Sequence, residues 1–160
     1  MIRLTCDPGD NTGLALWGES ETFQGWDSIH LKGKEKKLPT PERHLIMMDR
    51  FHEYLEKQTF EGIDSFIIEG VSLWGNSSKS QASALRGDSF RLAYLVGGYI
   101  TKIREIFPSV EIKIVDVRSW KGNLPTPILE NEVERFIGER APNEHISCAV
   151  GIQMNEIGIL

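Results

Sequence analysis

The sequence is short of cysteine, of long hydrophobic runs and of excess positive charge. Among its 160 residues are only two cysteines, Cys6 and Cys148, which is too few for a disulfide framework and lacks the paired spacing of a zinc site. No stretch approaches the roughly 18 apolar residues of a membrane span, and no basic N-terminal region precedes a long apolar block. We therefore expect two free thiols in a soluble, cytoplasmic protein that has no contact with a membrane.

The charge balance is acidic, with 23 Asp and Glu against 18 Lys and Arg and a formal net charge of −5. This balance argues against a protein that coats nucleic acid nonspecifically, although a net charge does not say where the charges lie. Basic residues gather in two predicted loops and after a second acidic strand end, and a solvated surface is the simplest interpretation of any one group. The groups are Lys32, Lys34, Lys36 and Lys37; Lys79, Arg86 and Arg91; and Arg118 and Lys121 on either side of Trp120.

The hydrophobic pattern predicts one α/β domain over residues 1–160, because the length and the 40% apolar content suit a single core. The first three predicted strands form an antiparallel meander, and the later ones, which alternate with helices, pair in parallel. We therefore expect a five-stranded mixed sheet flanked by helices. The predicted strands are 2–7, 13–18, 21–28, 63–70 and 110–117, and the predicted helices are 41–58, 80–106, 128–140 and 143–158.

Two acidic residues stand where predicted strands end. Asp7 follows the alternating run that ends at Cys6, and Glu69 follows the apolar run Phe66–Ile68. If these two strands are parallel neighbours, the carboxylates lie side by side at one edge of the sheet. Two such groups repel each other unless a cation lies between them, so the pair suits Mg²⁺ or Mn²⁺. The alternative for the first segment is a plain β-hairpin in which Asp7 begins the turn.

The last predicted helix carries a second group of polar residues. His145 and Cys148 are three positions apart and therefore share a face of that helix. The neutral imidazole of His145 could bind a metal, and its protonated form could stabilise charge on a leaving oxygen. The alternative is an ordinary polar residue in the first turn of a helix.

These residues resemble the RuvC-type Holliday-junction resolvases of the RNase H-like superfamily, especially the bacteriophage versions. The resemblance covers nearly the whole chain and rests on four motifs in the same order. They are Asp7-Pro-Gly with Thr12-Gly13-Leu14-Ala15 and Trp17; Ile67-Ile68-Glu69; Trp120-Lys121-Gly122 with Leu124-Pro125; and His145-x-x-Cys148-Ala149-Val150-Gly151-Ile152.

The resemblance implies an RNase H-like fold and an endonuclease that resolves four-way DNA junctions. In such enzymes Asp7, Glu69 and an acidic or His residue of the last helix, here His145, would bind two Mg²⁺ ions, with Mn²⁺ as a substitute, that activate water for phosphodiester hydrolysis. It further implies a homodimer in the cytoplasm of a bacterium or of a phage-infected host cell.

The sequence departs from the family at Cys148, because the family's last motif has a metal-binding Asp at this catalytic position. A thiol has an ordinary pKa of about 8.5, so it is mostly protonated at pH 7. Its soft sulfur also disfavours Mg²⁺ relative to Zn²⁺. We therefore expect this chain to cut DNA weakly or not at all while it still binds DNA.

Contacts with DNA are expected from the loops that follow two of the strands. Trp74 is the candidate for stacking on an unpaired base at a branch point, although a core or dimer-contact tryptophan is the alternative. The predicted phosphate contacts are Lys79, Arg86, Arg118 and Lys121. The predicted helix 80–106 is apolar on more than one face, so it is either deeply buried or shared with a second subunit.

Three other functions compete with a resolvase. A noncatalytic protein that binds branched DNA is favoured by Cys148, and an RNase H-like nuclease acting on flaps, forks or RNA:DNA hybrids has the same carboxylates. A sugar-kinase or actin-like ATPase also places Asp-x-Gly-x-Thr after its first strand. That fold needs two duplicated domains, and the 160 residues hold one.

Overall fold

A computed structural model describes residues 1–58, 62–71 and 87–160. Its centre is a five-stranded sheet in the order β3-β2-β1-β4-β5, which confirms the mixed sheet expected from the sequence. Strands β1, β2 and β3 form an antiparallel meander, whereas β4 pairs in parallel with β1 and β5. The strands are β1 (Arg3–Asp7), β2 (Asn11–Trp17), β3 (Phe23–His30), β4 (Ser65–Gly70) and β5 (Glu111–Asp116).

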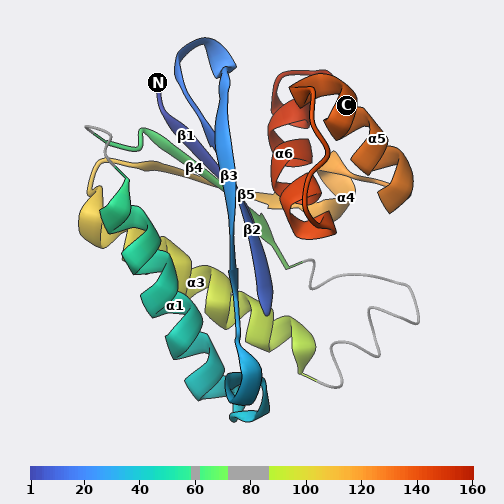
Figure 1. Cartoon of the computed structure of the whole chain (residues 1–160). Coiled ribbons are helices and arrows are strands. Elements are labelled where there is room, and N and C mark those ends of the chain that lie inside the picture. Colours follow the sequence, from blue (N-terminus) through green and yellow to red (C-terminus); the bar gives the residue numbers. More distant parts are fainter. Residues whose placement is uncertain (59–61, 72–86) are drawn as a thin grey trace.

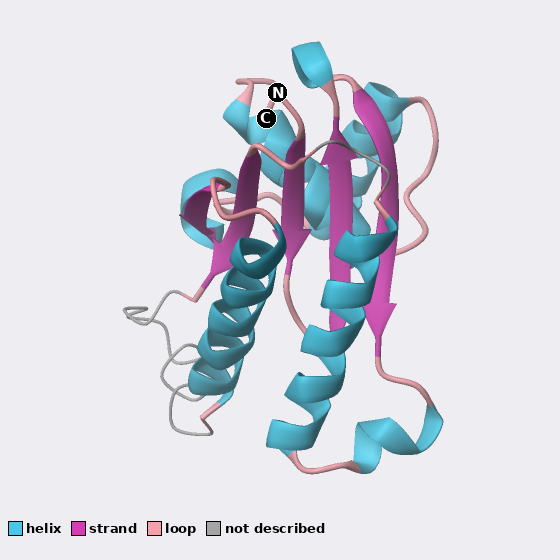
Figure 2. Ribbon diagram, turned by 90° about the vertical axis from the view of Figure 1, so that its left-hand side faces the viewer, coloured by secondary structure: helices cyan, strands magenta, loops and turns pink. Residues whose placement is uncertain are grey.

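Helices cover both faces of the sheet (Figure 1). Two long helices, α1 (Thr40–Lys57) and α3 (Asp88–Ile106), lie side by side on one face, as Figure 2 shows from the side. The other face carries α4 (Val117–Trp120), α5 (Thr126–Ile137) and α6 (Glu144–Glu156). Two short 3₁₀ helices, η1 (Glu19–Glu21) and η2 (Gly33–Lys37), flank β3. No helix in the described ranges is both long enough and apolar enough to cross a bilayer.

The alternation of residues along the strands divides the core into two parts. In β1, Leu4 and Cys6 are fully buried against α1 and α3. The alternate residue Thr5 accepts a hydrogen bond from the indole of Trp17, which packs on the α6 side. Because side chains alternate between the two faces of a strand, Asp7 lies on the same face as Thr5, toward α6.

Several element boundaries differ from those expected by a few residues. Strand β3 continues to His30, and η2 lies inside the segment 29–40 that was expected to be a loop. Helix α4 lies partly inside the expected loop 119–127. Residues 80–86 of the expected helix 80–106 lie outside the described residues, and α3 begins at Asp88. The last helix starts as expected, since the side chain of Asn143 accepts a hydrogen bond from the backbone N–H of Ile146.

Candidate active site

Two carboxylates meet at the edge of the sheet where β1 and β4 end. Cys6 lies opposite Ile68 in the parallel register, so Asp7 and Glu69, the next residues along, are neighbours. Both side chains lie on the α6 face, because Phe66 and Ile68 occupy the core on the opposite face of β4. The structure therefore brings together the two acids that the sequence analysis placed at this edge.

Asp7 makes a hydrogen bond to the first turn of α6. Its Oδ2 lies 2.9 Å from Nδ1 of His145. Burial raises the pKa of Asp7 above its ordinary value, although the hydrogen bond from His145 works in the opposite direction. The same hydrogen bond raises the pKa of His145 and outweighs the partial burial of the imidazole. This hydrogen bond therefore favours a protonated imidazole beside an ionised carboxylate.

The close approach of α6 to the sheet depends on Gly13, which lies opposite Asp7 in β2. A Cβ atom at this position would overlap the carbonyl group of His145 and the backbone nitrogen of Ile146. Only a glycine lets the first turn of α6 lie directly on the strand. Gly13 is thus the position that lets His145 reach Asp7.

Glu69 is held from the other side by Trp120, at the end of α4. The indole Nε1–H donates a 2.9 Å hydrogen bond to Oε2 of Glu69. Burial raises the pKa of Glu69 to about 7, and the charge of Asp7 adds to the rise, while the bond from Trp120 and the charge of Lys121 oppose it. A fraction of Glu69 is therefore protonated near neutral pH.

Cys148 lies one turn after His145 on α6 and is 8% exposed. Burial raises the pKa of its thiol to about 12, with a further contribution from the charge of Asp7. The thiol is therefore neutral at physiological pH. The Nζ of Lys121 donates a hydrogen bond to Sγ at 3.5 Å and another to Oγ1 of Thr126 at 3.4 Å. An ammonium group thus lies beside the position where the resemblance implies a carboxylate.

Of the other predicted site residues, one lies in the described part of the chain and three do not. Arg118 is exposed in α4, where its backbone N–H donates to Asp116. Trp74, Lys79 and Arg86 lie outside the described residues. The hydrogen bond from Trp120 to Glu69 was not predicted, because the sequence shows only that Trp120 follows the fifth strand.

Only the two carboxylates of this site, those of Asp7 and Glu69, are suitable ligands for a hard cation such as Mg²⁺. Within 1–58, 62–71 and 87–160, no three His, Cys, Asp or Glu side chains are arranged as a metal-binding group. Asp7 and Glu69 nevertheless raise each other's energy when both are ionised, and a divalent cation between their oxygens would remove that penalty. The neutral thiol of Cys148 and the ammonium of Lys121 do not fit such an ion.

Comparisons with known proteins agree on the fold. No family model matches the sequence, and no curated protein matches it. The structure of T. thermophilus RuvC in complex with a Holliday junction substrate is similar over 99% of this chain and 98% of that one, with a TM-score of 0.68 and 14% identity. A second Thermus thermophilus RuvC structure matches with a TM-score of 0.68 and 15% identity over 98% of this chain and 93% of that one. Identities this low establish the fold alone, and this fold is RuvC-like.

Proposed function

We propose that this chain, whose fold is RuvC-like, binds four-way DNA junctions and cuts them by metal-dependent phosphodiester hydrolysis, with Cys148 limiting the cutting step. The observation that supports this proposal best is the convergence of Asp7, Glu69 and His145 at one edge of the sheet. A fold hosts many functions, so the proposal depends on this cluster and not on the fold. We propose one nuclease domain spanning residues 1–160.

Asp7 and Glu69 are the residues that would hold Mg²⁺ or Mn²⁺. A divalent ion bound there supplies an activated water and offsets charge on the phosphate. Trp120 orients the Glu69 carboxylate through its indole N–H. Lys121 places a positive charge beside both acids, where it attracts the phosphate backbone.

His145 is suited to proton transfer. Its Nδ1 is engaged by Asp7, and its Nε2 points to Glu144, 3.9 Å away. The imidazole side chain is 30% exposed, so the ring is partly accessible to a substrate. The hydrogen bond to Asp7 raises the pKa of His145, which favours the protonated ring that would donate to the leaving oxygen.

A second candidate function is noncatalytic binding of branched DNA, and the geometry of Cys148 favours it. The neutral thiol, hydrogen-bonded to Lys121, stands where a third anionic ligand is expected. Loss of that ligand would weaken metal binding but leave unchanged the residues predicted to contact DNA, which are Trp74, Lys79, Arg86, Arg118 and Lys121. The two functions differ only in whether metal-dependent cutting is measurable.

We also propose that the chain acts as a homodimer and that the remaining basic loops contact DNA. The α1–α3 layer carries large exposed apolar side chains, with Phe90 70% and Tyr94 56% exposed on successive turns of α3. Covering such a surface is the usual role of a subunit interface. We assign Trp74, Lys79, Arg86 and Arg118 to DNA contacts, as the sequence analysis predicts.

One experiment tests these proposals together. Labelled four-way, forked, flap, linear and RNA:DNA hybrid substrates are incubated with the protein and Mg²⁺ or Mn²⁺, and both binding and cleavage are measured. We expect preferential binding of the four-way junction and slow cutting that an Asp7→Asn variant abolishes. Binding without any cutting would support the noncatalytic function. Equal binding of all substrates would overturn both.

A further inference from the structure

The short helix η2 lies at the same edge of the sheet as the candidate active site. Strand β3 is antiparallel to β2, and β2 is antiparallel to β1, so β3 runs in the same direction as β1. The strands β1, β3, β4 and β5 therefore all end at one edge. The chain leaves β3 at this edge and immediately forms η2, which lies beyond the lower end of the sheet in Figure 1.

Four lysines are exposed in and beside η2. They are Lys32, Lys34, Lys36 and Lys37. None of them forms an ion pair with a carboxylate of the described residues, because the one acid within the helix, Glu35, is taken by Arg50 at 2.7 Å. The hydrogen bond from the Lys32 backbone lowers the pKa of Glu35, and the pairing with Arg50 lowers it further.

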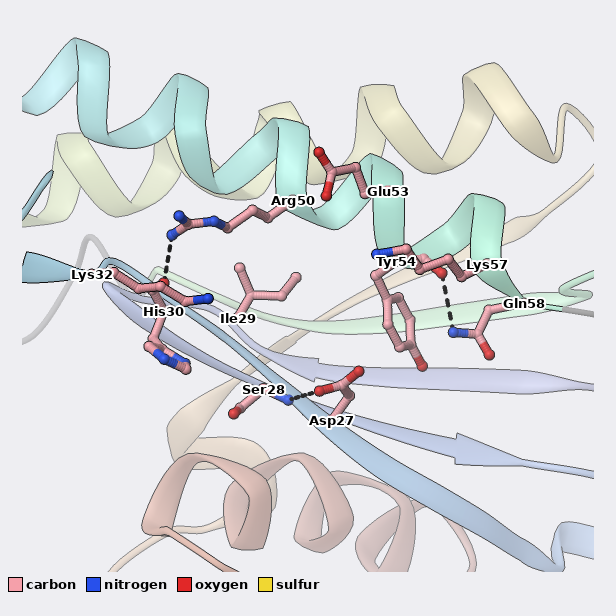
Figure 3. A pocket seen from close by; sticks show the side chains of 10 residues that line it. All are labelled: Asp27, Ser28, Ile29, His30, Lys32, Arg50, Glu53, Tyr54, Lys57 and Gln58. Carbon is pink, nitrogen blue, oxygen red and sulfur yellow. Dashed lines mark hydrogen bonds between the residues drawn. The ribbon is translucent and has the colours of Figure 1, made fainter.

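Arg50 of α1 links helix η2 to the rest of the molecule through two hydrogen bonds. One Nη of Arg50 donates to the backbone oxygen of His30 at 2.6 Å, and the other donates to Glu35. Figure 3 shows Arg50 reaching from α1 across to His30, at the end of a groove of about 260 Å³ where Lys32 also lies. The lysines are therefore carried on a backbone held to both β3 and α1.

The surface between η2 and the acids carries little uncompensated negative charge among the described residues. Asp10, in the turn between β1 and β2, is paired with Arg43 at 2.7 Å. Two strand spacings separate β3 from β1, which is roughly 10 Å. Allowing for η2 itself, the lysines lie on the order of 15 Å from Asp7, or about four to five base pairs along a duplex axis at roughly 3.4 Å each.

We propose that η2 is a second phosphate-binding surface, which holds a duplex arm of the DNA a few base pairs from the phosphate that is cut. The proposal rests on the proposed function, since it takes branched DNA as the ligand. In a protein with a net charge of −5, a local group of unpaired lysines attracts the DNA backbone to one face and sets its direction. Lysines that contact phosphates position a duplex without reading its sequence.

The test compares salt dependences of junction binding. The variant Lys34→Ala/Lys36→Ala removes two charges from η2. Its matched control, Lys57→Ala/Arg104→Ala, removes two exposed charges from the last turns of α1 and α3, at the opposite edge of the sheet. Binding to a labelled four-way junction is measured between about 50 and 200 mM salt. The plot of log K against log salt has a negative slope, which each phosphate contact steepens by roughly 0.9. We expect this slope to be shallower by about 2 in the η2 variant and unchanged in the control.

A second arm of the experiment locates the contact on the DNA. Replacing the phosphates about four to five positions from the branch point by neutral methylphosphonates removes the charges that η2 would reach. The wild-type slope should then become shallower, whereas that of the η2 variant should not change. Equal slopes for the η2 variant, the control and the wild type, with the wild type still preferring junctions, would overturn this proposal alone. A wild type that binds junctions no better than linear duplex would overturn the proposed function as well. Thermal unfolding of each variant verifies that it is folded.

Discussion

The Oδ2 atom of Asp7 and the Nδ1 atom of His145 are 2.9 Å apart, although 138 residues separate them in the sequence. This hydrogen bond joins the end of the first strand to the first turn of the last helix. It fixes which imidazole nitrogen is engaged and leaves Nε2 for other partners. The bond is therefore at once a tertiary contact and the arrangement on which the proposed proton transfer depends.

The pKa of His145 should depend on Asp7. The hydrogen bond to Asp7 is the largest cause of its raised pKa, so Asp7→Asn should lower it toward about 6.5. Protonation of His145 stabilises the fold fully below about pH 6.5, and this contribution is lost as the pH rises through the folded-state pKa. NMR titration of the ring protons measures the shift. Glu144→Gln is the control, because the charge of Glu144 has a smaller effect on His145 than Asp7 has, so this variant should change the pKa less. An unchanged pKa of His145 in Asp7→Asn would contradict the contact between the two residues.

Replacing Glu69 should stabilise the protein while removing any cutting. The pKa of Glu69 rises from its ordinary value of 4.5 to about 7 in the folded state. Between these values the unfolded chain loses a proton that the folded chain keeps, so stability falls as the pH rises from about 4.5 to 7. The loss is about 3 kcal/mol above pH 7. Glu69→Gln keeps an acceptor for Trp120 and should recover roughly this amount at pH 8 in chemical denaturation.

The control for Glu69→Gln is a glutamate that is exposed on the same sheet. Glu111, at the start of β5, is such a residue, and Glu111→Gln should leave the stability curve close to that of the wild type. A Glu69→Gln protein that is less stable than the wild type at pH 8, or that keeps the wild-type slope between pH 4.5 and 7, would show that Glu69 is not held in an unfavourable charged state.

The sequence predicts the sheet and the position of the two acids because both follow from simple periodicity. Alternation along residues 2–7 puts Asp7 on the face opposite Cys6, and the structure confirms that Cys6 lies in the core between the sheet and the long helices. The parallel pairing of β1 and β4 follows from the order of strands and helices. The boundaries of β1 and β4 agree with the expected ones within two residues.

The contacts around the acids could not be predicted in the same way. Helix α4 has four residues, too few for a hydrophobic period, so the bond from Trp120 to Glu69 has no local signal. Helix η2 is rich in lysine and begins at a glycine, which is the composition of a loop. The contact of Lys121 with Cys148 depends on how α4 and α6 pack across 27 residues of sequence.

Gly13 should be intolerant of a side chain, in contrast to a glycine of α3. A Cβ at Gly13 would overlap the backbone of His145 and push α6 off the sheet. Overpacking of this kind costs about 1 to 3 kcal/mol, and here both partners are backbone, so the upper end is expected. At Gly97, within α3, no atom lies within 4 Å of an added Cβ, so Gly97→Ala should stabilise the helix by about 0.5 to 1 kcal/mol. Urea unfolding compares the two. A Gly13→Ala protein as stable as the wild type would contradict the close contact between α6 and β2.

Cys148→Asp should increase cutting of four-way DNA in Mg²⁺. The new carboxylate would stand on the α6 face beside Asp7 and Glu69, and Lys121, 3.5 Å from the present sulfur, would offset part of its charge. Hard oxygen ligands favour Mg²⁺ where a thiol does not, so we expect a gain of at least roughly 10-fold in the single-turnover rate. Cys148→Asn has nearly the same shape and no charge, so it should give no gain, and the Asp7→Asn/Cys148→Asp double variant should be inactive. If Cys148→Asp folds and binds junctions as the wild type does but cuts no faster, Cys148 is not the residue that limits the reaction.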